Sequence, residues 1–168
     1  ANILDANISL AIASKDDITG IDLIADRGIE IAVARTSFES AEEGDKRTIA
    51  WLEESKPTLI CLCGYLRLLN IRPWMKNRVI NIHPSLLPKH GGKGMFGMNV
   101  HKSVIEHGDS ESGCTVHFVD EQYDHGKTIL QKTCSVNKDE TPCSLAQKVF
   151  KLECNAYVEA IQIITSKL

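Results

Sequence analysis

The run Arg78-Val-Ile-Asn-Ile-His-Pro-Ser-Leu-Leu-Pro-Lys89 begins as a short apolar strand and ends as a stiff loop. Asn81 and His83 are two positions apart, so their side chains lie on the same side of the predicted strand, with Ile82 on the other side. Pro84 disfavours helix at His83 and keeps it extended. Ligands of open α/β sheets gather at the carboxyl ends of strands, so Asn81 and His83 are candidate site residues.

The same kind of pattern extends toward the N-terminus. Val/Ile/Leu-rich runs at residues 8–13, 29–33, 58–63 and 78–82 predict strands. Residues 19–27 and 40–55 predict amphipathic helices between them, with Gly28 as a helix stop and Ile49 and Leu52 facing inward. This alternation predicts an α/β fold with a mostly parallel, doubly wound (Rossmann-like) sheet.

Toward the C-terminus the pattern changes. Residues 113–119 and 128–136 predict two strands joined directly by a polar loop, so this C-terminal pair should be antiparallel. Asn99 is expected to cap a short helix that runs to His107. Thr141 and Pro142 supply the N-cap and first position of a long final helix. We find no repeat or linker, so one domain over residues 1–168 is predicted.

The composition excludes several classes of protein. The chain has 168 residues, 43% hydrophobic and 24% charged, with a formal net charge of -3, which lacks the basic excess of a nucleic-acid binder. No run approaches the ~20 apolar residues of a membrane span, and the six cysteines are dispersed. The six histidines show no metal-binding spacing, so no catalytic metal is expected. We expect a cytoplasmic protein.

An amide beside an imidazole suits acyl or formyl transfer. Asn81 can donate a hydrogen bond to a developing oxyanion, and His83 can move a proton near neutral pH. The plain alternative is an asparagine that caps a loop and a histidine satisfied by backbone. Spacing alone leaves both interpretations open.

The loop from Asp120 to Gly126 holds three acidic residues. Such residues usually form solvated turns, and Asp124-His-Gly126 suits a turn. If the loop folds toward the sheet end, Asp124 reaches His83, raises the pKa of its imidazole and fixes its orientation.

Several motifs follow one another along the chain: Asn81 to Lys89, Val100-His101, Gly108, Gly113 to Val119, Asp124, Gly126 and Ile129-Leu-Gln131. In order and spacing they resemble the glycinamide ribonucleotide formyltransferase family of the formyltransferase superfamily, over nearly the whole chain. The insertion from Gly91 to Gly97 resembles a bacterial branch of that family.

This resemblance implies a formyltransferase fold and transfer of the formyl group of 10-formyltetrahydrofolate, the co-substrate, to the amine of glycinamide ribonucleotide in purine synthesis. It implies Asn81, His83 and Asp124 as the catalytic residues. The residues implied for the folate site are Leu66, Arg67, Leu68, Leu69, Asn81, Asp120, Glu121, Gln122, Tyr123 and Asp124.

The resemblance also implies that the ribonucleotide is bound by the helix segment Phe150, Lys151, Leu152 and Glu153, with Glu153 on the ribose hydroxyls. Without the resemblance, Glu153 is simply an exposed helix residue.

Two departures from the family pattern stand out. The family's chain begins with a strand and a Gly/Ser/Asn-rich loop that holds the substrate phosphate, and nothing similar precedes residue 8. We therefore expect this N-terminal piece to be missing from the sequence, and leave the phosphate site unassigned. Where many relatives carry an arginine for the folate glutamate tail, this chain has Ala41.

Alternative functions remain. A formyltetrahydrofolate hydrolase has water as its acceptor, a methionyl-tRNA formyltransferase needs an RNA-binding domain after the final helix, and a ligand-binding module needs no His83. The expected partners are two small molecules, with no nucleic acid and no membrane, and the oligomeric state is left open between monomer and homodimer.

Overall fold

The computed structural model describes residue 4, residues 6–18 and residues 20–166. Its contacts divide these residues into two units, one up to Thr58 and the other from Leu59 onward. The first unit holds two strands and two helices. The second holds four strands, two α-helices and one 3-10 turn, and it contains every residue that the sequence singles out for catalysis.

In the first unit, β1 (Ala11–Ala13) and β2 (Ile31–Val33) pair in parallel, and α1 (Gly20–Ala25) connects them. Gly28 follows α1 at a φ of 67°, a left-handed conformation that glycine adopts without strain. Thr19, which we expected to begin this helix, lies outside the described residues.

The helix α2 (Ala41–Ser55) begins where the sequence predicts. The Ser40 side chain accepts a hydrogen bond from the Glu43 backbone N–H, and the Glu43 carboxylate accepts one from the Ser40 N–H, which forms a capping box. Ile49 and Leu52, the residues predicted to face inward, are buried.

The second unit is built on a mixed sheet of order β3-β4-β5-β6. It consists of β3 (Ile60–Leu62), β4 (Val79–His83), β5 (Glu111–Phe118) and β6 (Thr128–Ser135), with the 3-10 turn η1 (Pro73–Met75) before β4. β3 and β4 are parallel, whereas β4–β5 and β5–β6 are antiparallel. The last pair has the direction expected from its direct connection.

The prediction of a mostly parallel arrangement is too strong. Among the described strands, two pairs are parallel and two antiparallel. The connection after β4 contains α3 (Met98–Glu106), which packs against the final helix α4 (Pro142–Thr165). The chain then re-enters the sheet beside β4 in the opposite direction. A connection that contains a helix permits either direction, so the sequence does not reveal which one is adopted.

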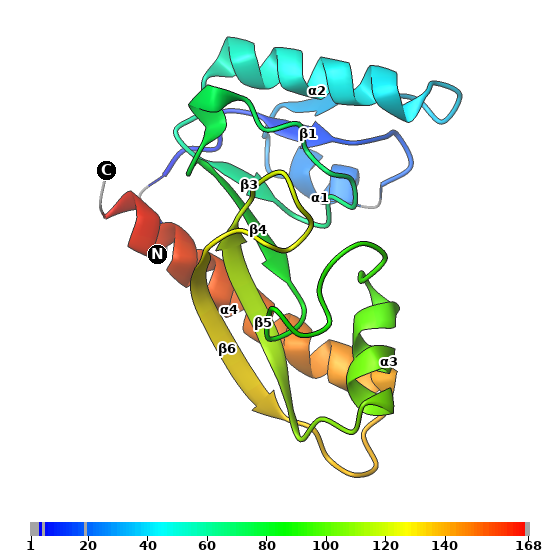
Figure 1. The fold of residues 1–168 in the computed structure, drawn as a ribbon. Coiled ribbons are helices and arrows are strands. Elements are labelled where there is room, and N and C mark those ends of the chain that lie inside the picture. The colour runs from blue at the N-terminus through cyan, green and yellow to red at the C-terminus, as the bar shows by residue number, and fades with distance from the viewer. Residues whose placement is uncertain (1–3, 5, 19, 167–168) are drawn as a thin grey trace. The chain divides into compact units, whose positions relative to one another are not determined.

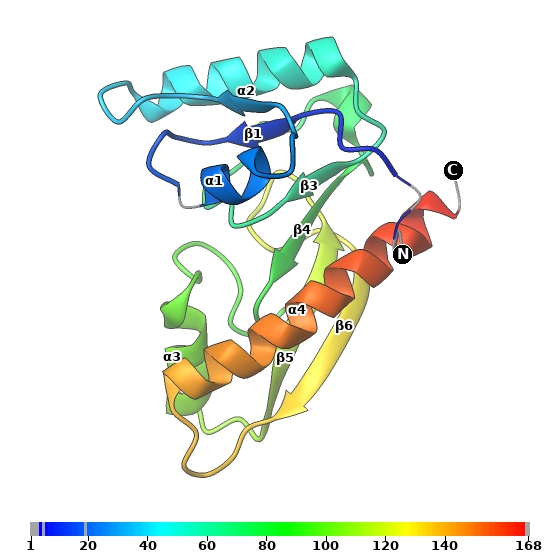
Figure 2. The same cartoon turned by 180° about the vertical axis from the view of Figure 1, so that it is seen from behind.

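Helix α4 crosses one face of this sheet, over β5 and β6 (Figure 1, and from behind Figure 2). Thr141 caps its first turn and Pro142 occupies the first position, as predicted. The core between helix and sheet is fully buried and comprises Ile80, Val104, Cys114, Val116, Leu145, Val149, Ala156 and Ala160. Burial of these apolar side chains fixes β4, and with it the site at its end.

Helix α3 begins slightly differently from the prediction. Gly97, at a φ of 53°, is its N-cap, and Asn99 lies inside the first turn. The Asn99 side-chain amide donates instead to the Gly94 carbonyl at 3.3 Å. A glycine is favoured at Gly97 because the chain enters the helix with positive φ.

Candidate active site

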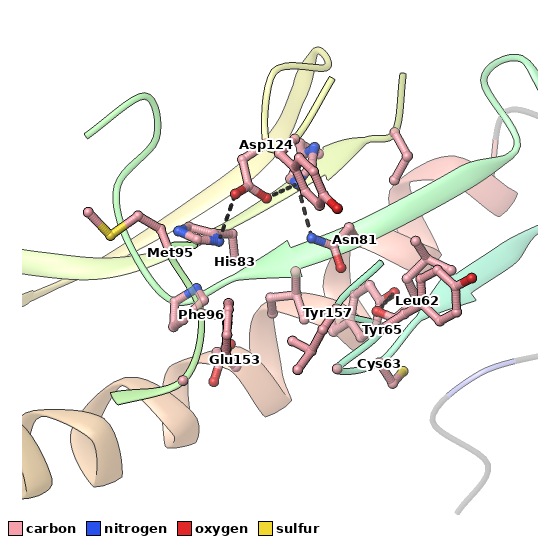
Figure 3. A pocket seen from close by; sticks show the side chains of 18 of the residues that line it. Leu62, Cys63, Tyr65, Asn81, His83, Met95, Phe96, Asp124, Glu153 and Tyr157 are labelled. Carbon is pink, nitrogen blue, oxygen red and sulfur yellow. Dashed lines mark hydrogen bonds and ion pairs between the residues drawn. The ribbon is translucent and has the colours of Figure 1, made fainter. Parts of the chain in front are cut away.

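The carboxyl end of β4 presents Asn81 and His83 on one side of the strand. Ile80 belongs to the core and Ile82 packs against it, so strand alternation directs the two polar side chains the other way. His83 is only 4% exposed. Both residues line one cavity of about 1150 Å³, which lies entirely within the second unit (Figure 3).

Asp124 reaches this strand end from the loop between β5 and β6. Its Oδ2 lies 3.4 Å from Nδ1 of His83, and its side chain is 10% exposed. Asp124 has a φ of 54°, which turns the chain back toward β5. Gly126 then passes so close to the Phe118 carbonyl oxygen that any side chain there would overlap it. The loop therefore folds toward the sheet end, the condition under which we expected Asp124 to meet His83.

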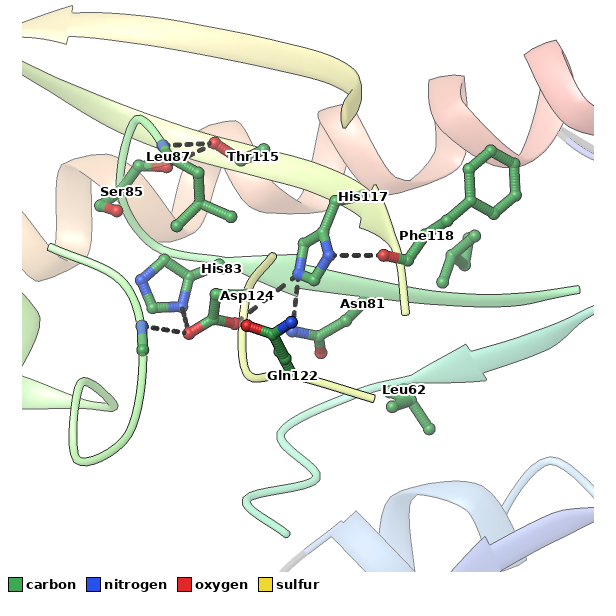
Figure 4. Close-up of polar contacts among 12 residues, drawn as sticks. Leu62, Asn81, His83, Ser85, Leu87, Thr115, His117, Phe118, Gln122 and Asp124 are labelled. Atoms are coloured by element: carbon green, nitrogen blue, oxygen red, sulfur yellow. Dashed lines mark hydrogen bonds and ion pairs between the residues drawn. The ribbon is translucent and has the colours of Figure 1, made fainter. Parts of the chain in front are cut away.

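The His83 imidazole is held at both nitrogens. Its Nε2–H donates to the carbonyl oxygen of His90 at 2.8 Å. Its Nδ1 faces Asp124 (Figure 4). In the neutral ring the Nδ1 lone pair faces a carboxylate oxygen, whereas in the imidazolium an N–H points at that oxygen. The arrangement favours a ring that gains a proton during the reaction and transfers it afterwards.

The pKa of His83 is lowered overall, although Asp124 itself raises it as expected. Burial is the largest cause, because it disfavours the charged ring. Asp124 acts in the predicted direction, but its attraction is smaller than the effect of burial.

The carboxyl group of Asp124 shows the opposite balance. Burial raises its pKa, but contacts with His117, His83 and the Gly92 N–H together outweigh burial, so the pKa lies below the usual value. The Gly92 N–H donates to Oδ2 at 3.0 Å. At neutral pH the pair therefore consists of a charged carboxylate and a neutral imidazole.

His117 is a site residue that sequence reasoning missed, since the sequence indicates only that it lies within the strand predicted over residues 113–119. It lies opposite Asn81 in the β4–β5 ladder. Its Nδ1–H donates to the Phe118 carbonyl at 2.8 Å, which leaves Nε2 to accept from the Asn81 amide at 3.3 Å. One amide hydrogen of Asn81 is thereby fixed, and the second remains for a ligand in the cavity.

Most of the residues implied for the folate site border the cavity. They are Leu66, Arg67, Leu68, Leu69, Asn81, Gln122, Tyr123 and Asp124. Asp120 and Glu121 are not among the lining residues. The Asp120 carboxylate instead accepts hydrogen bonds from the Gln122 N–H at 2.9 Å and from His125 at 2.8 Å, which stabilises the loop from within.

The residues implied for the ribonucleotide also divide into some that line the cavity and some that do not. Phe150 and Glu153 line the cavity from α4, whereas Lys151 and Leu152 do not. Glu153 is partly buried, and burial raises the pKa of its carboxyl to about 7.

The glycine-rich segment between β4 and α3 also borders the cavity, through residues 92–98. His101 of α3 also lines the cavity. It is 5% exposed, and its Nδ1 has no hydrogen-bond partner within the described part of the chain. From the sequence, His101 is simply a residue of the short helix predicted to run to His107. A buried ring nitrogen without a partner cannot be recognised from a pattern of residues.

The described residues also bear on other kinds of site. No group of three or more His, Cys, Asp or Glu side chains there is arranged to hold a metal ion. None of the helices in that part of the chain has the length and apolar character needed to cross a membrane.

Comparison with known sequences gives a consistent picture. A family model described as formyl transferase matches residues 1–161. The trifunctional purine biosynthetic protein adenosine-3 of Drosophila melanogaster is 35% identical, over 97% of this chain and 12% of that protein. The chloroplastic phosphoribosylglycinamide formyltransferase of Arabidopsis thaliana is 33% identical, over 96% of this chain and 56% of that protein. The chain thus spans 12% to 56% of these curated relatives.

Solved structures agree with the sequence matches. A phosphoribosylglycinamide formyltransferase from Brucella melitensis is 34% identical, with a TM-score of 0.81, over 94% of this chain and 80% of that one. Glycinamide ribonucleotide transformylase 1 from Symbiobacterium toebii is 29% identical, also with a TM-score of 0.81, over 96% of this chain and 75% of that one.

Proposed function

The chain belongs to the formyl transferase family, and we propose that it transfers the formyl group of 10-formyltetrahydrofolate to the amine of glycinamide ribonucleotide. One observation carries this proposal: Asn81, His83 and Asp124 meet beside a cavity of about 1150 Å³. Together they offer an oxyanion donor, a proton carrier and a fixed negative charge.

The reaction begins when the amine of the ribonucleotide attacks the formyl carbon. A C–N bond forms, the carbonyl electron pair moves to oxygen, and the free amide hydrogen of Asn81 stabilises that oxyanion. At Nδ1, the nitrogen that does not donate to His90, His83 accepts the proton that the amine loses, and Asp124 stabilises the resulting imidazolium. The oxyanion then re-forms the carbonyl as the C–N10 bond breaks, and the proton passes from His83 to N10 of the folate, which regenerates neutral His83.

The folate moiety fits the apolar end of the cavity. Leu66, Leu68 and Leu69 offer apolar wall for a flat ring system, and Arg67 lies among them. The loop from Asp120 to Asp124 contributes Gln122 and Tyr123 to the same cavity. We assign the folate to these residues, with Asp120 holding the loop from within and Glu121 outside the cavity lining.

The ribonucleotide lies along α4 in this proposal. The Glu153 carboxyl lines the cavity, and the described residues offer it no hydrogen bond or ion pair. A carboxylate in that situation is suited to accept hydrogen bonds from the two ribose hydroxyls. Phe150 lies about one turn away on the same helix and also lines the cavity, whereas Lys151 and Leu152 do not line it.

At the level of fold, we retain a single formyltransferase domain with a doubly wound, Rossmann-like sheet. The parallel pairs β1–β2 and β3–β4, each accompanied by helices, support that arrangement. The likeness to solved formyltransferases over nearly the whole chain supports it as well.

The test is an assay of the full-length protein with both substrates. Formylglycinamide ribonucleotide should form together with deformylated folate, in equal amounts and only when glycinamide ribonucleotide is present. Mass spectrometry of the ribonucleotide and absorbance of the folate measure the two products. Release of formate without the acceptor would instead identify a hydrolase, and no turnover of either kind would overturn the proposal.

A further inference from the structure

The turn His90-Gly91-Gly92 contacts both members of the catalytic pair. The His90 carbonyl accepts the Nε2–H of His83 at 2.8 Å, and the Gly92 N–H donates to Oδ2 of Asp124 at 3.0 Å. These two backbone groups are only two residues apart in sequence. The placement of this turn therefore fixes the distance and angle between the His83 ring and the Asp124 carboxylate.

The turn is held by the side chain of His90. Its Nε2–H donates to Oδ2 of Asp109 at 2.9 Å, and its Nδ1 accepts from the Ser103 hydroxyl at 2.8 Å. The His90 side chain is 8% exposed, and Ser103 is buried within α3. The imidazole thus ties the turn to α3 and to the segment that leads into β5.

The backbone conformation of His90 indicates that the turn needs these two side-chain hydrogen bonds to keep its shape. His90 has a φ of 53°, in the left-handed region. That region is unfavourable for a residue other than glycine. Two partly buried hydrogen bonds, one of them to a charged carboxylate, offset this cost. Without them the glycines at positions 91 and 92 would let the turn relax.

We propose that His90 is a positioning residue, which through Ser103 and Asp109 sets the turn that orients His83 and Asp124. The proposal rests on the proposed formyl transfer for its kinetic test, but not for its structural one. His90 touches no reacting atom, and its effect on the reaction is carried by its own carbonyl and by the Gly92 N–H.

Three variants break, in different ways, the hydrogen bonds that the His90 side chain forms with Ser103 and Asp109. In His90→Asn the new side chain tolerates positive φ but is too short to bridge Ser103 and Asp109. Ser103→Ala and Asp109→Ala each remove one anchor and leave His90 in place. Asp109→Asn keeps an oxygen that can accept the His90 Nε2–H, and it serves as the conservative variant.

For His90→Asn and Asp109→Ala we expect kcat to fall about ten-fold, because a shift of the pair by a fraction of an ångström misaligns proton transfer. KM for each substrate should stay within about two-fold, since none of these side chains is assigned to a binding role. Asp109→Asn should recover most of the lost kcat. Glu159→Gln, which removes a surface ion pair between α4 and Lys132, is the matched control and should leave kcat unchanged.

The structural test is imidazole ¹⁵N NMR of the full-length protein, which needs no turnover. In the wild type at neutral pH, His83 should be protonated at Nε2 alone, and in His90→Asn and Asp109→Ala it should exchange between both tautomers. Circular dichroism and thermal melts identify any variant that does not fold, and Ser103→Ala then supplies the measurement. Unchanged kcat and an unchanged His83 tautomer in folded variants would overturn the positioning role. An inactive wild type with the expected tautomer change would overturn only the proposed function.

Discussion

Asp124 and Glu153 are carboxyl groups that line the same cavity, and they differ in everything that surrounds them. Asp124 receives the Gly92 N–H at 3.0 Å and lies 3.4 Å from His83 and 3.6 Å from His117. Glu153 has no hydrogen bond or ion pair to any described residue. The pKa of Asp124 is therefore lowered despite burial, whereas burial alone raises the pKa of Glu153 to about 7.

The difference separates two uses of a carboxylate. Asp124 is already committed to protein groups, so it acts as a fixed negative charge that favours the imidazolium of His83. Glu153 is uncommitted, so its hydrogen-bonding capacity is available to a ligand. A group that must stabilise a transient charge is best held rigidly in advance, while a group that binds a ligand is satisfied only when the ligand arrives.

The largest expected effect comes from removing the fixed charge. Asp124→Asn keeps an oxygen that can accept the Gly92 N–H, but it no longer stabilises the His83 imidazolium. We expect kcat to fall on the order of a thousand-fold, equivalent to about 4 kcal/mol. The pKa of His83 should also fall further, because Asp124 is the main group that raises it. Steady-state kinetics over a range of pH measure both effects, and the limb assigned to His83 should move to lower pH. A His83 limb that stays in place would contradict the assigned pairing.

Removal of the oxyanion donor should have the next largest effect. Asn81→Ala deletes the amide that is oriented by His117, and kcat should fall about a hundred-fold or more. KM for the ribonucleotide should change little, because the lost interaction forms in the transition state. Single-turnover experiments measure the chemical step directly. Normal turnover in a folded Asn81→Ala variant would exclude the oxyanion role.

Glu153 should affect stability in a pH-dependent way. Its folded-state pKa, about 7, lies above its ordinary value of 4.5, so the folded protein holds this proton more tightly than the unfolded chain does. The contribution of Glu153 to stability is therefore present below pH 4.5 and is lost as pH rises toward 7. Above pH 7, Glu153→Gln should be more stable than the wild type by on the order of 2 kcal/mol.

Urea unfolding of both proteins at pH 5 and pH 8 measures this change. The advantage of Glu153→Gln should be small at pH 5 and full at pH 8. Glu159→Gln, on the same helix but paired with Lys132 at the surface, should show little such pH dependence. An equal difference between wild type and Glu153→Gln at the two pH values would contradict the burial of an uncompensated carboxyl group.

The sequence predicted which residues meet around Asp124 better than it predicted the pKa values that result from their burial. Asn81 and His83 follow from strand alternation, and the turn residues before Gly126 made the approach of Asp124 plausible. The direction of the His83 pKa did not follow, because burial depends on the whole unit. His117 was missed because its partner is set by the β4–β5 register, and a shift of one residue would turn it away from Asn81.

Prediction of the fold was limited in the same way, because features set by tertiary packing could not be predicted from local signals. Local signals located Ser40, Thr141 and Gly28 as helix boundaries, since each works through its nearest neighbours. The direction of β5 relative to β4 was not accessible, because it depends on how α3 packs on α4. Glu153 was identified through the family resemblance alone, since nothing within the helix pattern distinguishes a partly buried glutamate from an exposed one.

The smallest effect should be the sharpest test of Glu153 as a ligand group. Glu153→Gln keeps an oxygen acceptor but loses the charge, so KM for glycinamide ribonucleotide should rise about five- to ten-fold, while kcat and KM for the folate change little. Because its pKa is about 7, wild-type KM for the ribonucleotide should fall as pH rises from 6 to 8, and this dependence should vanish in the variant. A rise in folate KM instead would place the other substrate against α4 and reverse our assignment of the two ends of the cavity.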